Sequence, residues 1–145
     1  VICLKTEFDT AGSLVESVYA NSIGIGTDIM SESMSITLSY VDGSNAVINY
    51  FSNGSKKYSK ERIEVYSNQK TWILDNYIKT TGYGVKNFKN LKSRINKGHQ
   101  IQFKKFIESI KKGNGPLISL EQLINVSHAS FAAISSIRSN NIIKI

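Results

Sequence analysis

The residue types that could carry out chemistry lie in a few short segments, and the first of these is rich in glycine. Gly24-Ile25-Gly26-Thr27-Asp28-Ile29 approaches the Gly-x-Gly-x-x-Gly fingerprint of dinucleotide-binding proteins, but Ile29 replaces the third glycine. The fingerprint also requires a helix directly after it, because the N-terminus of that helix holds the pyrophosphate. The residues that follow are Met-Ser-Glu-Ser-Met, which lead into a strand, so we expect no cofactor binding in this segment.

The single cysteine and the two histidines do not have the spacing of a metal site or a catalytic triad. Cys3 lies in an apolar run, which predicts a small buried hydrophobic residue. His128 lies beside the apolar stripe of a predicted helix, which predicts a packed or boundary position. His99 is the better candidate, because it stands at a predicted strand-to-helix junction, where loop residues often carry function. A capping or surface role for His99 is the alternative.

Charge is distributed unevenly along the chain. Residues 56–112 hold fifteen Lys or Arg against four acidic residues, a net charge of +11, whereas residues 1–55 have a net charge of −5. A concentrated basic stretch suggests an anionic partner such as a nucleic acid, a phosphate or another acidic ligand. Lys56, Lys57 and Lys60, with Tyr58 among them, could hold a phosphate or stack on a base. A solvated, lysine-rich surface is the alternative, because dedicated phosphate forks favour arginine.

Length and composition predict one foldable domain. The chain has 145 residues, 41% of them apolar, with one proline and one cysteine. This excludes a disulfide scaffold, fits a reducing compartment, and allows a sizeable core. No run approaches 18 apolar residues, so we expect no membrane-spanning helix. The apolar start Val1-Ile2-Cys3-Leu4 suggests a piece of a longer protein. Two glycosylation sequons, at Asn53 and Asn125, are expected to be accidental.

The clearest structural signal is a hairpin. Two β-rich runs, Ser35–Val41 and Ser44–Phe51, flank Asp42-Gly43, which predicts a two-residue type I′ turn. That turn would pair Leu38 with Val47 and Thr37 with Ile48. Residues 46–48 are apolar on both faces of the second strand, so we expect the sheet to be covered on both sides. The C-terminal helices would cover one side, and something outside the chain, or a second copy of it, would cover the other.

The remaining pattern predicts more strands and then two helices. Further strands are expected at residues 14–20, 62–66, 71–74, 77–81 and 85–91, the last two forming a hairpin around Gly82-Tyr83-Gly84. The first helix has the apolar face Phe103, Phe106, Ile107 and Ile110 and ends at Gly113. The second begins at the N-cap Ser119 with a capping box to Gln122, and its apolar positions are Leu120, Leu123, Ile124, Phe131, Ile134 and Ile137. This order predicts an α+β fold, an open, mainly antiparallel β-sheet with two C-terminal helices packed on one face.

These pieces in this order resemble a known family. The matching segments are Ile36-Thr37-Leu38, Asp42-Gly43-Ser44, Asn53-Gly54-Ser55-Lys56, residues 60–66, Leu74-Asp75-Asn76-Tyr77, Lys97-Gly98-His99, residues 106–110, Ser119-Leu120-Glu121 and residues 131–137. From about residue 13 to the end, the chain resembles the C-terminal domain of Gfo/Idh/MocA-type oxidoreductases. It is most similar to bacterial members associated with sugar and sugar-nucleotide oxidation in cell-surface polysaccharide pathways.

The resemblance implies that residues 1–145 form one substrate-binding and oligomerisation domain. Members of the family have an N-terminal Rossmann domain that binds NAD or NADP and carries a catalytic lysine in a Glu-Lys-Pro motif; nothing in this sequence matches either. The family also places a histidine, with an aspartate nearby, where the C-terminal domain begins. Residues 1–8 resemble the helix just after it, so that histidine would lie upstream of Val1. The chain alone would then be inactive. The implied reaction is hydride transfer from a sugar hydroxyl carbon to the nicotinamide, while a base takes the hydroxyl proton.

The resemblance also implies substrate contacts and partners. We expect Asn53, Lys56, Lys97 and His99 to contact the sugar or its diphosphate, with Tyr83 as a secondary candidate. The implied partners are the chain's own Rossmann domain, a sugar or sugar-nucleotide substrate, and a second copy in a homodimer or higher oligomer formed through a sheet face. We expect a cytoplasmic location and neither membrane nor nucleic-acid binding. The alternative is a non-enzymatic binding module for an acidic partner such as nucleic acid, which would require lysines and aromatic residues to converge on one surface.

Overall fold

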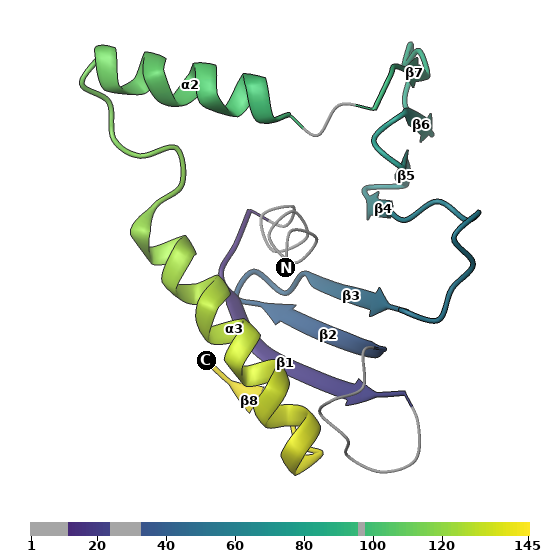
Figure 1. Cartoon of the computed structure of the whole chain (residues 1–145), viewed down its shortest axis with the longest axis vertical. Coiled ribbons are helices and arrows are strands. Elements are labelled where there is room, and N and C mark those ends of the chain that lie inside the picture. Colours follow the sequence, from purple (N-terminus) through teal and green to yellow (C-terminus); the bar gives the residue numbers. More distant parts are fainter. Residues whose placement is uncertain (1–11, 24–32, 96–97) are drawn as a thin grey trace. The chain divides into compact units, whose positions relative to one another are not determined.

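The chain divides into two compact units, each built on one antiparallel sheet (Figure 1). The computed structural model describes residues 12–23, 33–95 and 98–145. The first unit comprises Val1–Gly54 and Ile118–Ile145, and the second comprises Ser55–Leu117. Among the described residues each unit contains a four-stranded sheet and one long helix. The predicted α+β class with antiparallel strands and C-terminal helices is therefore confirmed.

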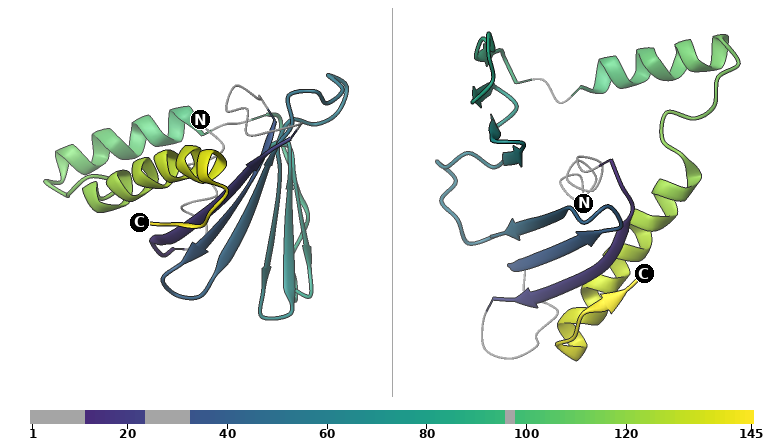
Figure 2. Two further views of the ribbon diagram at one scale, coloured as in Figure 1. Left: turned by 90° about the horizontal axis from the view of Figure 1, so that it is seen from below. Right: turned by 180° about the vertical axis from the view of Figure 1, so that it is seen from behind.

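The first unit is a sheet crossed by one helix. Its strands lie in the order β3-β2-β1-β8. Their bounds are β1 Val15–Ser22, β2 Met34–Tyr40, β3 Asn45–Tyr50 and β8 Ile143–Lys144, and the helix is α3 Leu120–Ser139. The short strand β8, which the sequence pattern did not predict, pairs with β1 at Ser17 and Val18. Figure 2 shows α3 lying along β1 on one side of this sheet.

The predicted hairpin is present, but its predicted register is wrong by one residue. Thr37 pairs with Val47 and Ile36 with Ile48, so the loop contains Val41, Asp42 and Gly43 rather than two residues. Gly43 has a φ of 83°, whereas Asp42 does not have the positive φ that a type I′ turn needs at both central positions. The Asp42 carboxylate instead accepts a hydrogen bond from the backbone N–H of Ser44 at 3.0 Å. This Asx turn followed by a left-handed glycine is the geometry of a three-residue hairpin loop.

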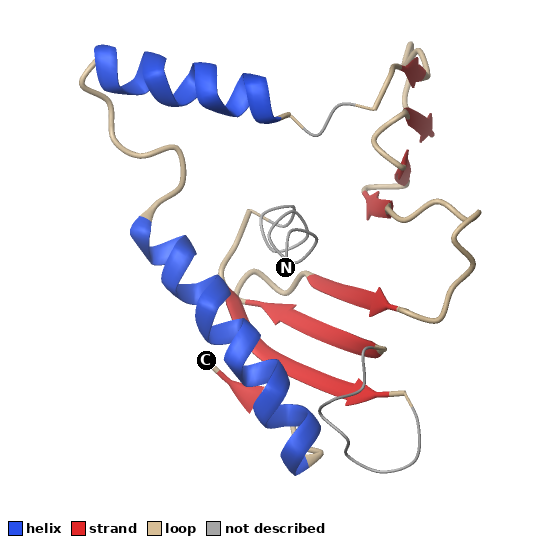
Figure 3. Ribbon diagram, viewed as in Figure 1, coloured by secondary structure: helices blue, strands red, loops and turns tan. Residues whose placement is uncertain are grey.

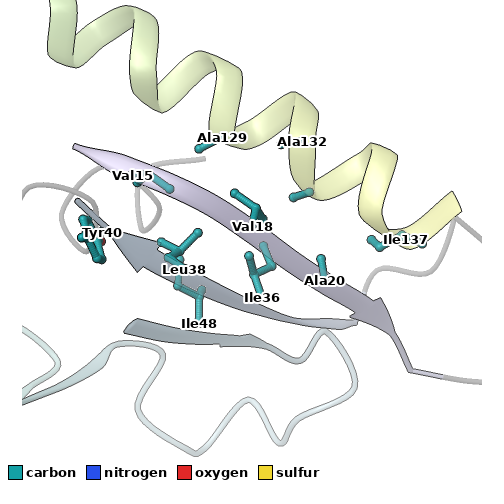
Figure 4. Packing of buried hydrophobic residues seen from close by; sticks show 11 residues of the cluster. Val15, Val18, Ala20, Ile36, Leu38, Tyr40, Ile48, Ala129, Ala132 and Ile137 are labelled. Atoms are coloured by element: carbon teal, nitrogen blue, oxygen red, sulfur yellow. The ribbon is translucent and has the colours of Figure 1, made fainter. Parts of the chain in front are cut away.

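Helix α3 packs on the sheet through small side chains. Its buried residues are Ala129, Ala132, Ala133, Ser136 and Ile137. The three alanines and Ile137 form one hydrophobic cluster with the buried strand residues Val15, Val18, Ala20, Ile36, Leu38, Tyr40 and Ile48 (Figure 4). Of the predicted apolar positions only Ile137 is buried, while Phe131 is 66% exposed and Leu120 is 69% exposed. The prediction selected the larger apolar side chains of this helix. The buried face consists mainly of alanines instead, because small residues let the helix approach the strands closely. His128, expected at a packed or boundary position, is exposed.

Two side chains of α3 form hydrogen bonds with backbone groups of β1 at positions beyond the two ends of the short strand β8. The Asn125 amide accepts from the backbone N–H of Val15 at 2.8 Å and donates to its carbonyl oxygen at 2.9 Å. The Ser136 hydroxyl accepts from the backbone N–H of Ala20 at 2.9 Å. Because β8 is too short to cover these positions, the helix supplies the partners that buried backbone groups require. Asn125 therefore has a structural role in the fold.

The face of the first sheet that points away from α3 is polar. Pairing places Tyr19 and Val47 on this face in one row with Thr37. Its other members are Ser17, Asn21, Ser35, Ser39, Asn45, Asn49 and Lys144. We call these residues the outer face. Val47 is 59% exposed. The prediction of apolar residues on both sides of β3 thus reduces to one valine, since the corrected register puts Ala46 and Ile48 together on the side of α3.

The second unit contains the sheet β4-β5-β6-β7 (Figure 3). The strands are β4 Arg62–Ser67, β5 Lys70–Asp75, β6 Lys79–Tyr83 and β7 Leu91–Lys92. The predicted turn at residues 82–84 and the predicted strand at residues 85–91 are wrong. Gly82 and Tyr83 still belong to β6, and only Leu91 and Lys92 form a strand. The intervening segment folds back, so that the Phe88 ring would lie 2.6 Å from a Cβ atom on Gly82. This packing explains why a glycine occupies the strand.

Helix α2, His99–Lys111, also belongs to the second unit and ends where the sequence predicts. Gly113 has a φ of 64°. The backbone N–H of Gly113 donates to Ile110 and that of Asn114 donates to Ser109, which is a Schellman C-cap. Helix α3 begins with the predicted capping box, in which Ser119 and Gln122 bond reciprocally. The predicted packing of both helices on one sheet face is observed for α3 and stays a prediction for α2.

Candidate binding surface on the second sheet

Cross-strand pairing in the second sheet gathers charged and aromatic residues on one face. Residues directly opposite each other in neighbouring antiparallel strands share a face. One row across the strands is Arg62, Asp75, Lys79 and Lys92; the next is Glu64, Ile73 and Thr81; the third is Tyr66, Thr71 and Tyr83. We call these ten residues the polar face. The opposite face contains Ile63, Val65, Trp72 and Leu74, next to Phe88.

A hydrogen-bonded network runs along β4 on the polar face. Glu64 accepts from the Arg62 Nε at 2.7 Å and from the Tyr66 hydroxyl at 2.6 Å, so both its carboxylate oxygens are engaged. The hydrogen bond from Tyr66 and that from Arg62 lower the pKa of Glu64. The same bonds raise the pKa of Tyr66 and of Arg62. The guanidinium is therefore neutralised locally, and the Tyr66 ring is held along the strand while 71% of the residue stays exposed.

Lysines dominate the other end of the polar face. Lys79 on β6 and Lys92 on β7 are directly opposite each other. Asp75 is opposite Lys79 on its other side, and Arg62 lies beyond it. Among the described residues neither lysine forms an ion pair. The acidic residues of this face thus lie on β4 and β5, whereas Lys79 and Lys92 lie on β6 and β7, with Asp75 next to Lys79 in the same row.

Two glycines fix the position of Tyr83. A Cβ atom on Gly82 would meet the Phe88 ring, and one on Gly84 would lie 2.5 Å from the carbonyl oxygen of Gln69. Gly84 also has a φ of 70°. The chain on both sides of Tyr83 is therefore closely packed, while Tyr83 itself is 57% exposed. Sequence analysis placed this residue in a turn, but the structure places it on a strand, facing the same side as Tyr66.

The structure does not assemble the four predicted substrate contacts into one described site. Asn53 is exposed in a turn that is tied down by a hydrogen bond from the backbone N–H of Ser52 to the Ser33 hydroxyl at 3.1 Å. Lys56 is exposed in the next turn, within the second unit. His99 is the exposed first residue of α2, following Gly98, which offers no side-chain cap. Lys97 lies outside the described residues. These four contacts remain predictions.

Other candidates add little chemistry. Cys3 and residues 24–29 lie outside the described residues. Within the described ranges no cluster of His, Cys, Asp or Glu could hold a metal ion, and no helix is long and apolar enough to cross a bilayer. A hollow of about 110 Å³ lies at the C-terminal end of α2, lined by Phe106, Ser109, Ile110 and residues 114–117. The Ser109 hydroxyl there already donates to the Gly115 carbonyl at 2.8 Å, so the hollow offers an apolar lining and no free reactive group.

The polar face is suited to binding rather than to catalysis. It presents aromatic rings, hydroxyl groups, a locked carboxylate and two lysines, but no nucleophile with an adjacent base. Sequence reasoning missed Arg62, Glu64, Lys79 and Lys92 as a group. The Arg-x-Glu-x-Tyr spacing of residues 62–66 has the strand period and could have placed three residues on one face. Their neighbours follow only from the register.

Comparison with solved structures identifies the fold. No family model and no curated protein sequence matches the chain. An oxidoreductase from Agrobacterium radiobacter, in complex with NAD⁺, L-tartaric acid and magnesium, is 13% identical with a TM-score of 0.77, over 97% of this chain and 46% of its own. An aldose-aldose oxidoreductase from Caulobacter crescentus, complexed with glycerol, is 13% identical with a TM-score of 0.76, over 99% and 45%. The WlbA dehydrogenase from Bordetella pertussis, in complex with NADH and UDP-GlcNAcA, is 16% identical with a TM-score of 0.58, over 98% and 42%.

The chain therefore spans less than half the length of these structures, while nearly all of it is matched. The chain shares its fold with the matched part of these oxidoreductase structures. The resemblance read from the sequence segments is confirmed at the level of the fold.

Proposed function

We propose that the chain is the substrate-binding and dimerisation domain of an NAD(P)-dependent oxidoreductase that acts on a sugar or a sugar nucleotide. The observation that carries this proposal is the match of 97–99% of the chain to 42–46% of three oxidoreductases. One of those structures contains NADH and UDP-GlcNAcA, and another contains NAD⁺. These ligands support a nicotinamide cofactor and are compatible with a nucleotide-linked sugar.

The nicotinamide cofactor belongs, in this proposal, to a separate Rossmann domain. A dinucleotide site needs a glycine-rich loop between a strand and a helix. In the described residues the segment between β7 and α2 contains a single glycine, Gly98, and the N-terminus of α3 is already capped by Ser119. The described part of the chain thus does not fit the cofactor. Its task would be to hold the sugar so that the reacting carbon lies close to the nicotinamide, since orientation supplies much of the rate of such transfers.

Asn53, Lys56, Lys97 and His99 are the proposed substrate contacts. Exposure of Asn53, Lys56 and His99 supports this role, because each side chain is accessible to a ligand. Alanine substitution of a true contact should raise KM in the complete enzyme, by about tenfold where a charge-assisted hydrogen bond is lost. Lys112, an exposed lysine just after α2, is the matched control. Equal effects for Lys56→Ala and Lys112→Ala would remove Lys56 from the proposed site.

Dimerisation is proposed through the outer face of the first sheet. No described helix or strand of the unit covers this face, and its short hydroxyl and amide side chains can pack closely against a second sheet. Val47→Lys places a charge in the middle of the face and should convert a dimer into a monomer in sedimentation equilibrium. Val41→Lys, at an exposed valine in the hairpin loop, is the control and should leave the dimer intact. A chain that is monomeric at all concentrations contradicts this part of the proposal.

The decisive experiment is a comparison of this chain with the longer protein that contains it. The longer protein should bind NAD or NADP and produce the reduced cofactor with a panel of sugars and sugar nucleotides, whereas residues 1–145 alone should show no turnover. A longer protein that binds neither NAD nor NADP would overturn the oxidoreductase proposal.

A further inference from the structure

We propose that the polar face of the second sheet binds a nucleoside diphosphate group, with the base stacked on Tyr83 and the diphosphate between Lys79 and Lys92. The inference deepens the proposed function and rests on it for the sugar that the diphosphate carries. It identifies the substrate as a sugar nucleotide and assigns its nucleotide end to the face on which Tyr83, a secondary candidate from the sequence, lies with Lys79 and Lys92.

The lysine pair provides the first argument. Like charges directly opposite each other on neighbouring strands are destabilising. Lys79 and Lys92 are such a pair, and among the described residues neither has an ionic partner. Lysines on edge strands can also discourage aggregation, which would account for Lys92 on β7 but not for Lys79 on β6. An anion bound between the two ammonium groups removes their repulsion.

The tyrosine provides the second argument. Tyr83 is 57% exposed and lies on the same strand and face as Lys79, four residues away. Their Cα atoms are about 13 Å apart at the ordinary rise of a strand, which leaves room for a nucleoside between the ring and the ammonium group. Thr71 lies between Tyr83 and Tyr66 in the same row. The side chain next to the Tyr83 ring is therefore a short one, which favours access of a base to the ring. Stacking on an aromatic ring is available to every base, because every base has a π-face.

The distribution of charge favours a small diphosphate over a nucleic-acid strand. The whole +11 segment lies in the second unit, which gives long-range attraction for any anion. On the polar face, however, Glu64 and Asp75 occupy β4 and β5. A strand crossing this face would bring phosphates against these carboxylates. A diphosphate confined to β6 and β7 meets the two lysines, and Asp75, one strand away from Lys79, is the one carboxylate in their row.

Calorimetric titration of residues 1–145 with UDP tests the inference. We expect binding that weakens with added salt, and weaker binding of uridine or of inorganic pyrophosphate, each of which lacks one half of the ligand. Tyr83→Ala should weaken UDP binding about tenfold, whereas Tyr83→Phe keeps the stacking ring and should bind as the unchanged chain does. Lys92→Ala should weaken UDP and pyrophosphate alike. Tyr50→Ala and Lys104→Ala, at exposed positions outside the polar face, are the matched controls.

The alternatives give different results. No UDP binding at low salt, or equal affinity of the Tyr83→Ala and Tyr50→Ala variants, would overturn the inference. Pyrophosphate that binds as tightly as UDP would overturn the role of the ring, and an oligo(dT) strand that binds far more tightly than UDP would replace the diphosphate by a nucleic acid. Circular dichroism of each variant excludes unfolding as the cause. Because the titration involves no redox step, UDP binding can succeed when the oxidoreductase assay fails, and the converse result would sink only this inference.

Discussion

Removal of the Ser136 hydroxyl should lower the free energy of unfolding of the first unit by more than the loss of an exposed hydroxyl group would. Ser136 and Ala20 are almost completely buried, at 0% and 1% exposure. The hydroxyl accepts from the backbone N–H of Ala20 at 2.9 Å and donates to the carbonyl of Asn141 at 2.6 Å. In Ser136→Ala the carbonyl of Asn141, an exposed residue, can turn to water, but the buried Ala20 N–H has no replacement partner among the described residues. A buried unsatisfied donor costs about 1–3 kcal/mol, so we expect a loss of about 2 kcal/mol and a fall in Tm of about 7 °C.

Urea unfolding followed by far-ultraviolet circular dichroism measures this loss. Ser139→Ala is the matched control, because Ser139 lies on the same helix, is exposed, and donates only to the helical carbonyl of Ser135 at 2.9 Å. It should change the free energy of unfolding by less than about 0.5 kcal/mol, as surface substitutions usually do. If Ser136→Ala were as stable as Ser139→Ala, the completion of β1 by the helix would not contribute to stability, and the argument would be refuted.

Three further outcomes follow from local geometry. Gly82→Ala should lower Tm by several degrees, because its Cβ atom would lie 2.6 Å from the Phe88 ring; an unchanged Tm would mean that the ring does not pack there. Tyr66→Phe removes the hydrogen bond that most lowers the pKa of Glu64, so an NMR titration should show that pKa rising toward its ordinary value. Since the folded pKa lies below the unfolded one, Glu64 stabilises the fold at neutral pH, and this contribution is lost as pH falls through the folded pKa. Asp42→Gly should destabilise the chain by about 1 kcal/mol, through lost Asx bonding and added backbone freedom, while Asp42→Asn stays neutral in urea unfolding.

Local chemistry made part of the fold predictable from the sequence. The capping box at Ser119 and Gln122 and the C-cap at Gly113 depend on residues a few positions apart, and both are present as predicted. The strand at residues 62–66 follows from its β-rich composition and is confirmed. The hairpin around Asp42-Gly43 follows from the same kind of information. Each of these elements depends on residues that are close together in the sequence, so each could be predicted without knowledge of the tertiary fold.

The errors arise where the outcome depends on a distant partner. Asp42-Gly43 is compatible with both a two-residue and a three-residue loop, and only the packing of Ile36 and Ile48 on the same side as α3 selects the longer one. A slip of one residue would turn Val47 toward the helix and Ile48 outward.

The same dependence explains why the polar face could not be predicted. Arg62 and Lys92 are 30 positions apart and share a row only because three consecutive strand pairings are in register. The segment between β6 and β7 illustrates the point most directly. Its residues fold back so that Phe88 covers Gly82, and Tyr83, the next residue along the strand, faces the other side. The aromatic group of the candidate site is therefore positioned by a packing contact on the opposite face of the sheet.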